Sequence, residues 1–245
     1  MAQISLRPGG SVAISTAPEE HALPHSWVVW EQWAAEASSS YGECIRPIAT
    51  AHTVESFWSA YRQIAQPSQL FTGSKVESLS VFLAGIRPAW EEDANANGGE
   101  LYCRRSGSPQ QLDRLWHMVV LGIVGGSIEG AVELVTGVRV VKKSSGGRVT
   151  HRLEVWIRTE EASTPLRNAL VAALQSAPDE TAPADASIAA PPSVEPPAPA
   201  ATSLDCAQPS DRNAAAIVHC LNQPLNTRGL RWEYRSHKKA NQKAG

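Results

Sequence analysis

The sequence predicts a single α/β (α+β) domain in which an antiparallel sheet is backed by helices. Residues 137–143 and 148–158 alternate apolar and polar side chains with a period of two, which is typical of strands with one buried face. From Leu112 to Ile123 apolar residues recur at helical spacing. Hydrophobic residues make up 42% of the 245 residues, which is enough to bury a core.

The N-terminal part predicts a strand followed by a helix. Residues 26–33 are aromatic and β-branched, as expected of a strand. Thr53 is a suitable N-cap, and the apolar residues after it lie at i, i+3, i+4 and i+7: Val54, Phe57, Trp58 and Tyr61. This pattern predicts a helix that starts at residue 54.

The helix with the stripe from Leu112 to Ile123 has clear end signals. Ser108 to Gln111 reads as a capping box with Pro109 in the first turn, and Gly125-Gly126 is a stop signal. Further on, residues 230–236 predict a closing strand. Residues 165–174 and 212–221 are both candidates for the last core helix, and the sequence does not separate them.

Composition divides the chain into four parts. Residues 1–20 are expected to be a flexible N-terminal tail, and residues 21–175 the folded domain. Residues 176–208 are expected to be a disordered insert, because Ala177 to Ala200 holds eight Ala and seven Pro. Residues 209–245 are expected to return to the same domain and to end in a basic tail.

Several classes of protein are excluded by composition and motifs. The net charge of −2 excludes a strongly basic nucleic-acid coat, although a small basic patch remains compatible with it. The chain has no apolar run of 18 residues, and its four cysteines form no CxxC pair, which predicts a reduced protein without structural zinc. No GxSxG, P-loop or HExxH motif is present, so we do not expect an enzyme.

The strand at 148–158 places a cation and an indole on one face. Period two puts Arg152 and Trp156 on the same side, opposite Leu153, Val155 and Ile157. One interpretation is a binding site on the face that is not the core face. The alternative is a solvated sheet with one isolated Trp.

Tryptophan is the most frequent aromatic residue here, with eight Trp beside three Phe and four Tyr. The tryptophans belong to motifs that occur in this order: His21-x-Leu23, Trp27-x-x-Trp30, residues 53–58 (TVESFW), residues 86–92 (IRPAWEE) with Gly98-Gly99 after them, residues 112–116 (LDRLW), residues 135–137 (VTG) and residues 153–156 (LEVW). In order and spacing the chain resembles the eukaryotic translation initiation factor 4E family, the mRNA cap-binding proteins, over about residues 21–160 and again at residues 234–237. The resemblance implies a strongly curved sheet backed by about three helices, with the cap slot on the concave face.

The resemblance also implies a ligand, the 7-methylguanosine triphosphate cap, and no cofactor or metal. The cationic base would be held between the rings of Trp90 and Tyr41, where the family usually has a second Trp. Glu91 would accept hydrogen bonds from the guanine edge. Trp156 would lie near the N7 methyl group, a core position being the alternative.

The phosphates of the cap need fixed cations. The resemblance assigns this role to Lys143 and Arg152, with Lys142 adjacent. Glu100 stands where the family usually has a basic residue, so either the loop is rearranged or phosphate binding relies on these cations and on residues 237–239 of the tail. Ordinary solvated charges are the alternative for the tail.

The opposite face is implied to bind a partner as an amphipathic helix, from an eIF4G-like scaffold or a 4E-binding protein. The positions that match are His21, Leu23, Val54, Trp58 and Leu121. The sequence departs from the family at Ala22, His117 and Met118, which removes an acid and predicts an unusual partner.

Three functions therefore remain open. The protein is expected to bind capped mRNA and a scaffold to initiate translation. The alternatives are a cap-binding repressor or specialised paralogue with a non-standard partner, and an interaction module that has lost cap binding. We expect a monomer in a heteromeric complex, located in the cytoplasm, with a nuclear pool as the alternative.

Overall fold

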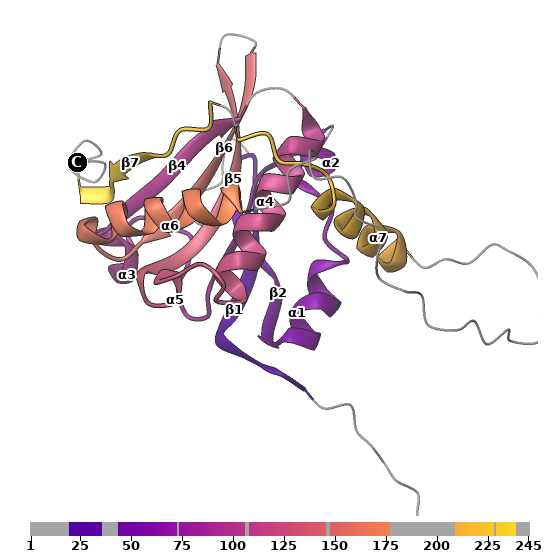
Figure 1. Cartoon of the computed structure of the whole chain (residues 1–245), viewed down its shortest axis with the longest axis horizontal. Coiled ribbons are helices and arrows are strands. Elements are labelled where there is room, and N and C mark those ends of the chain that lie inside the picture. Colours follow the sequence, from indigo (N-terminus) through magenta and orange to yellow (C-terminus); the bar gives the residue numbers. More distant parts are fainter. Residues whose placement is uncertain are drawn as a thin grey trace, which may run out of the picture.

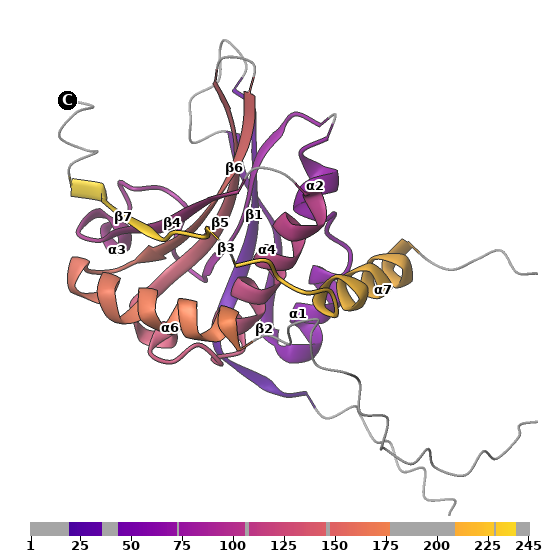
Figure 2. The same ribbon diagram turned by 45° about the horizontal axis from the view of Figure 1, so that its top comes forward.

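The structure is a computed structural model that describes residues 20–35, 44–72, 74–105, 108–145, 148–176, 209–227 and 229–238. Within these ranges seven antiparallel strands form one curved sheet in the order β2-β1-β3-β5-β6-β4-β7 (Figures 1 and 2). The strands are β1 (Ala22–Trp33), β2 (Ile45–Thr53), β3 (Val76–Leu83), β4 (Gly99–Arg105), β5 (Val135–Ser145), β6 (Arg148–Ile157) and β7 (Glu233–Ser236). The expected fold class is confirmed.

The helices of the described residues are α1 (Val54–Tyr61), α2 (Pro67–Leu70), α3 (Asp93–Ala96), α4 (Pro109–Val124), α5 (Ala131–Leu134), α6 (Ser163–Gln175) and α7 (Pro209–Leu221), with a 3₁₀ turn at Glu160–Ala162. The longer ones, α4 and α6, cover one face of the sheet. Figures 1 and 2 show α4 and α6 across the sheet and α7 beside α4. In the part of the chain that the structure describes, no helix is both long and apolar enough to cross a membrane.

The core lies between the sheet and helices α4 and α6. On β6, Leu153, Val155 and Ile157 are at most 1% exposed and face the helices, as the alternation predicts. They pack in one cluster with apolar side chains of α4 and α6, among them Leu115 and Leu170, which are fully buried. The polar side chains of β6 are therefore directed to the other, concave face of the sheet.

The capping and stop signals of the sequence are confirmed at two of three helix ends. Thr53 caps α1 in a capping box with Ser56, each side chain accepting from the other's backbone N–H. Helix α4 stops before Gly125, and Gly126 follows with a φ of +71°, which favours glycine. The capping box at Ser108 was wrong, because its hydroxyl donates to the side chain of Gln110 and caps no backbone N–H.

Both candidates for the last helix are helices. Helix α6 contributes three buried leucines to the core. Helix α7, which comes later in the chain, packs against α4. Arg114 of α4 is buried and donates to the carbonyl oxygens of Cys220, at 2.9 Å, and Leu221. A cation at the carboxyl end of a helix satisfies its last carbonyl groups and complements its dipole. Residues 1–19, 177–208 and 239–245, including most of the predicted tails and insert, lie outside the described residues.

His117 of α4 lies inside the molecule and not on its surface. Its side chain is 2% exposed, and its Nδ1 is 2.8 Å from the hydroxyl oxygen of Tyr61 on α1. Burial lowers the pKa of His117 to about 4, because the charged form loses its hydration. The interpretation of His117 as a changed partner contact is therefore wrong: this residue joins α4 to α1.

We predict that lowering the pH from 7 to 5 reduces the free energy of unfolding by about 2 kcal/mol through His117. The unfolded chain takes up this proton near pH 6.5 and the folded chain only near 4, so the unfolded state binds more protons in this window. Urea unfolding at several pH values measures the effect. His117→Gln should lose this part of the pH dependence and the exposed control His219→Gln should keep it; equal slopes in wild type and His117→Gln would contradict the assignment.

Candidate functional site

A cavity of about 720 Å³ lies on the concave face of the sheet. The residues that line it are Gln32, Glu77, Trp90, Glu91, Glu100, Arg139, Val141, Lys142, Lys143, Arg152, Trp156, Arg235 and His237. Five of the six side chains predicted to bind the ligand are among them. The sixth, Tyr41, lies outside the described residues.

The floor of the cavity is a row of alternating charges on neighbouring strands. Glu154 of β6 is fully buried and accepts from Nε of Arg152, at 2.7 Å, and from Nε1 of Trp156, at 3.0 Å. Nη1 of Arg139, on β5, lies 4.0 Å from the same carboxylate. Buried charges are stable only when they are paired, so these contacts fix the positions of both cations and of the indole.

Glu100 continues this row onto β4. It is 1% exposed, and its carboxylate lies 3.5 Å from Nη2 of Arg152, 2.7 Å from Nη2 of Arg235 and 3.7 Å from Nε2 of His237. Burial acts to raise the pKa of Glu100, but His237 and the charges of Arg152 and Arg235 outweigh it and hold that pKa below its usual value. The charge of Glu100 is thus balanced by arginines while the residue stays in the regular strand β4. A rearranged loop at this position is therefore not needed to accommodate the acid.

Trp156 is both a wall of the cavity and a nearly buried residue. It is 4% exposed, and its ring meets Phe82 edge-on at 5.3 Å and His237 at 4.5 Å between ring centroids. Phe82 in turn covers Gly137, where a Cβ atom would lie 2.3 Å from the Phe82 ring. The face of the indole that is left to a ligand is therefore small and rigidly placed.

The loop that carries Trp90 and Glu91 is held by a residue that the sequence analysis missed. Asn95 is completely buried, and its side-chain amide donates to the carbonyl oxygens of Arg87, at 3.1 Å, and Ala89, at 2.8 Å. The indole N–H of Trp90 donates to the carboxylate of Glu91. An Asn inside a polar run gives no sequence signal, because its role depends on which carbonyl groups the loop brings near it.

His237 links this loop to the far wall of the cavity. Its Nδ1 donates to the backbone oxygen of Asn95 at 2.9 Å, and its backbone N–H donates to Gly98 at 3.0 Å. The side chain is 2% exposed. The alternative of an ordinary solvated charge is therefore wrong for His237, which lines the cavity. Of the other two tail positions, Lys238 is exposed and residue 239 lies outside the described residues.

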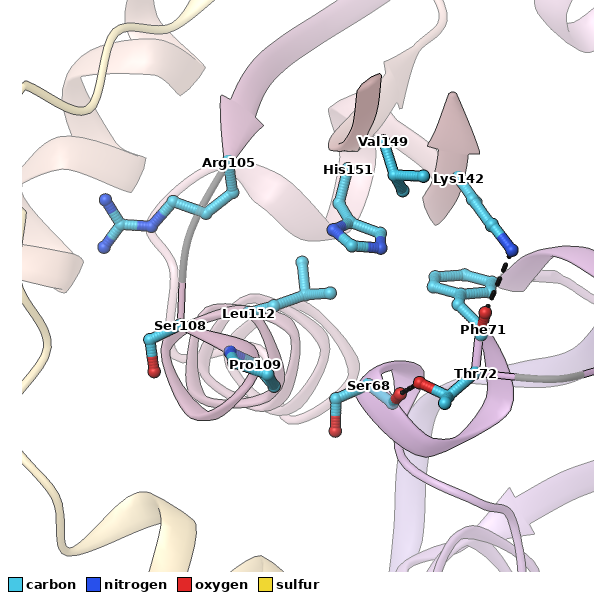
Figure 3. Close-up of a pocket in the computed structure, with 10 residues that line it drawn as sticks. All are labelled: Ser68, Phe71, Thr72, Arg105, Ser108, Pro109, Leu112, Lys142, Val149 and His151. Carbon is cyan, nitrogen blue, oxygen red and sulfur yellow. Dashed lines mark hydrogen bonds between the residues drawn. The ribbon is translucent and has the colours of Figure 1, made fainter. Parts of the chain in front are cut away.

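The two adjacent lysines of β5 face opposite sides of the sheet. Lys143 lines the concave cavity, where partial desolvation and the charges of Arg152 and Arg139 lower its pKa. The Nζ of Lys142 donates to the carbonyl oxygen of Phe71, at 3.0 Å, on the helix side (Figure 3). Lys142 therefore borders both cavities, and its ammonium group is engaged by the Phe71 carbonyl.

Figure 3 shows the second cavity that Lys142 reaches. It has a volume of about 350 Å³ and lies among α2, the start of α4 and the β5–β6 hairpin. The rings of Phe71 and His151 stack within it at 5.5 Å and 14°, which leaves no slot for a further ring between them. The concave cavity is therefore the better candidate for a flat ligand.

The predicted partner residues gather around α1 and α4. Trp58 is 38% exposed and is supported edge-on by Phe57 and Tyr61. Val54 is also exposed, and His21 is held beside it by Glu55, whose carboxylate lies 2.7 Å from the His21 Nδ1. That hydrogen bond lowers the pKa of Glu55 to about 2. These contacts fix an exposed indole beside apolar and charged groups.

At the other end of this surface Leu121 is half-buried and lines a small apolar hollow with Met118, Gly122, Ile128 and Leu174. Leu23 is likewise half-buried and packs against the core. A cluster of three or more His, Cys, Asp or Glu side chains able to hold a metal ion is not found among the described residues. The structure thus has a polar, charged cavity on one face of the sheet and a mostly apolar surface on the other.

The cavity on the concave face brings together indole rings, carboxylates and cations, the groups that recognise the base and the phosphates of a nucleotide. Residues 22–182 match the model of the family described as Eukaryotic initiation factor 4E. This match covers well over half of the chain, and the chain therefore belongs to this family.

Individual relatives agree with the family match. The chain is 30% identical over 149 residues to eukaryotic translation initiation factor 4E of Saccharomyces cerevisiae, covering 60% of this chain and 67% of that protein. It is 31% identical over 182 residues to factor 4E1 of Drosophila melanogaster, covering 69% and 67%. The crystal structure of Ascaris suum eIF4E-3 with the m7G cap has a TM-score of 0.57 at 28% identity, covering 66% of this chain and 87% of that one. The complex of C. elegans eIF4E-3 with the 4E-binding protein Mextli and cap analog has a TM-score of 0.55 at 25% identity, covering 66% and 89%.

We predict that Asn95→Ala loosens the Trp90 loop. The carbonyl groups of Arg87 and Ala89 would lose their donor, and the loss of two buried hydrogen bonds should cost about 1–3 kcal/mol of stability. Amide hydrogen exchange at residues 86–92 should become faster. The exposed Asn97→Ala is the matched control; equal protection of the loop in both variants would show that Asn95 does not hold it.

Proposed function

We propose that this protein binds the 7-methylguanosine cap of mRNA in the concave cavity and, through α1 and α4, a protein partner that initiates translation. The observation that carries the proposal is the pair Trp90-Glu91, on a loop held by Asn95, in a cavity that Lys143 and Arg235 also line. A flat ring, a carboxylate and cations are the three groups that a capped guanosine requires. The m7G cap bound to the related Ascaris suum protein supports the same ligand class here.

Each group of the ligand has a matching group in the site. The methylated base is a delocalised cation, which an indole face such as Trp90 attracts by about 0.5–2 kcal/mol in addition to stacking. A carboxylate such as Glu91 matches the two parallel N–H donors of the guanine edge. Glu91 now accepts from the indole N–H of Trp90, so ligand binding replaces that contact by the guanine edge. Tyr41 is proposed as the second ring.

The role proposed is binding without catalysis. The groups of the cavity contribute stacking, hydrogen bonding and charge. They distinguish a methylated guanosine triphosphate from GTP because only the methylated base carries a positive charge. We infer that the protein acts on capped mRNA in the cytoplasm, where translation takes place. The cap is a ligand in this scheme, and no cofactor is required.

The partner surface is proposed to accept an amphipathic helix from an eIF4G-like scaffold or a 4E-binding protein. A related C. elegans protein has been crystallised with the 4E-binding protein Mextli, which supports this class of partner. Trp58 supplies an exposed indole, a residue type enriched among hot spots, and Leu121 adds a half-buried apolar side chain. This surface lies on the opposite side of the sheet from the cap cavity, so both ligands can bind together.

A second function is favoured by Met118. It is a partly exposed apolar residue beside Leu121 at a position where the family resemblance places an acid. A partner peptide that relies on a positive charge at this point would lose its ion pair. A cap-binding repressor or specialised paralogue with a non-standard partner is therefore the alternative, and co-purification with a large scaffold protein would separate the two.

We predict that Trp90→Ala and Glu91→Gln each abolish retention on a 7-methylguanosine matrix, because the first removes the ring and the second the acceptor pair. Tryptophan fluorescence titration with the 7-methylguanosine triphosphate measures the loss, which should exceed about tenfold for either change. The neighbouring Glu92→Gln is the control and should bind normally. Wild-type-like binding by Trp90→Ala would remove this site from consideration.

We predict that Trp58→Ala weakens binding of the partner peptide by at least about 30-fold, the effect of a hot spot of 2 kcal/mol or more. Cap retention should be unchanged, because Trp58 lies on the helix-covered side. Isothermal titration with a scaffold peptide and a cap-matrix assay on the same sample test both statements. Val171→Ala, an exposed apolar change elsewhere, is the control; parallel loss of cap retention would mean that Trp58 supports the fold.

A further inference from the structure

Arg152, the cation that the family resemblance assigns to the phosphates, is already paired with two carboxylates. Its Nε and Nη2 lie 2.7 Å and 2.5 Å from Oε1 of Glu154, and Nη2 also lies 3.5 Å from Glu100. Its side chain is only 13% exposed, and its guanidinium lies over the ring of Tyr102 at 5.2 Å. A phosphate that engaged the same nitrogen atoms would take from Glu154, which is fully buried, the closer of its two charge partners and leave it only Arg139 at 4.0 Å, which is unfavourable.

Arg235 occupies a different position in the same row of charges. It lies on β7 directly opposite Glu100 in the register, and it lines the concave cavity. Its side chain is 47% exposed, and the contact to Glu100, at 2.7 Å, involves one nitrogen, Nη2. A guanidinium has five N–H donors in a planar fork, so an arginine held at one corner can still present donors to a second anion.

Glu100 gives Arg235 a defined orientation. The carboxylate is 1% exposed and is kept ionised by its neighbours, since its pKa lies below the usual value. A buried anion paired with a half-exposed cation fixes one end of the arginine and reduces the rotamer entropy lost when a phosphate binds. Lys143, which lines the same cavity, is exposed.

We propose that Arg235, anchored by Glu100, and Lys143 are the cations that contact the cap phosphates, while Arg152 is a positioning residue that holds Glu154 and, through it, Trp156. This inference rests on the proposed function. It assigns two roles to two arginines of the same cavity: Arg235 acts on the phosphates alone, and Arg152 acts on the shape of the base-binding wall.

The test compares two ligands on the full-length chain, 7-methylguanosine without phosphate and 7-methylguanosine triphosphate, by tryptophan fluorescence titration at a fixed salt concentration. For Arg235→Gln the affinity for the triphosphate should fall about tenfold, the affinity for the nucleoside should stay within twofold, and Arg235→Lys should recover part of the loss. The log–log salt dependence of triphosphate binding should become less steep by about one unit of slope. Arg231→Gln, an exposed change just before β7, is the matched control and should resemble wild type.

Arg152→Gln should behave differently, with affinity for both ligands falling by a similar factor. Triphosphate binding by Arg235→Gln within twofold of wild type, or an equal loss for nucleoside and triphosphate, would overturn the assignment of Arg235. A loss confined to the triphosphate in Arg152→Gln would overturn the division of roles. If the wild-type protein binds neither ligand, the proposed function fails, and this result is distinct from all of those above.

Discussion

Two carboxylates buried on the concave face of the sheet, Glu154 and Glu100, set the geometry on which the site depends. Each must be paired to be tolerated in the interior, and each is paired with arginines from neighbouring strands. Arg152 lies between them, so the side chains of β5, β6, β4 and β7 form one connected row. Moving β4, β5, β6 or β7 by one register step would separate a buried charge from a partner on a neighbouring strand, which ties the register of this half of the sheet to the shape of the cavity.

This row also explains why the two walls of the cavity differ. The wall that contains Trp156 is fixed by Glu154, Phe82 and His237 and has little freedom. The Trp90 wall is a loop, held by side-chain hydrogen bonds from Asn95 and joined to the fixed wall through His237. Both walls are therefore held in place before a ligand binds, which suits the recognition of a flat ligand.

The sequence predicted what depends on local patterns and missed what depends on distant pairing. Alternation on β6 placed Arg152 and Trp156 on the non-core face correctly, and Thr53 caps α1 as expected. The roles of Asn95, Lys142 and Arg235 could not be predicted in the same way, because each depends on a group that the fold brings near: carbonyl groups of the Trp90 loop, the Phe71 carbonyl and the Glu100 carboxylate. Residues 234–237 were recognised by resemblance, but only strand pairing with β4 reveals what Arg235 contacts.

On the helix-covered side, one residue that departs from the family pattern is buried in the core and the next one is partly exposed on the surface. His117 and Met118 are neighbours in sequence, yet His117 is buried against Tyr61 while Met118 stays partly exposed beside Leu121. Helix α7, which lies beyond the family match at 22–182, packs on α4 and is held there by Arg114. The indole of Trp58, on α1, stays 38% exposed. The departure at Met118 therefore lies on the proposed partner surface, whereas the change at His117 lies in the interior and acts on stability.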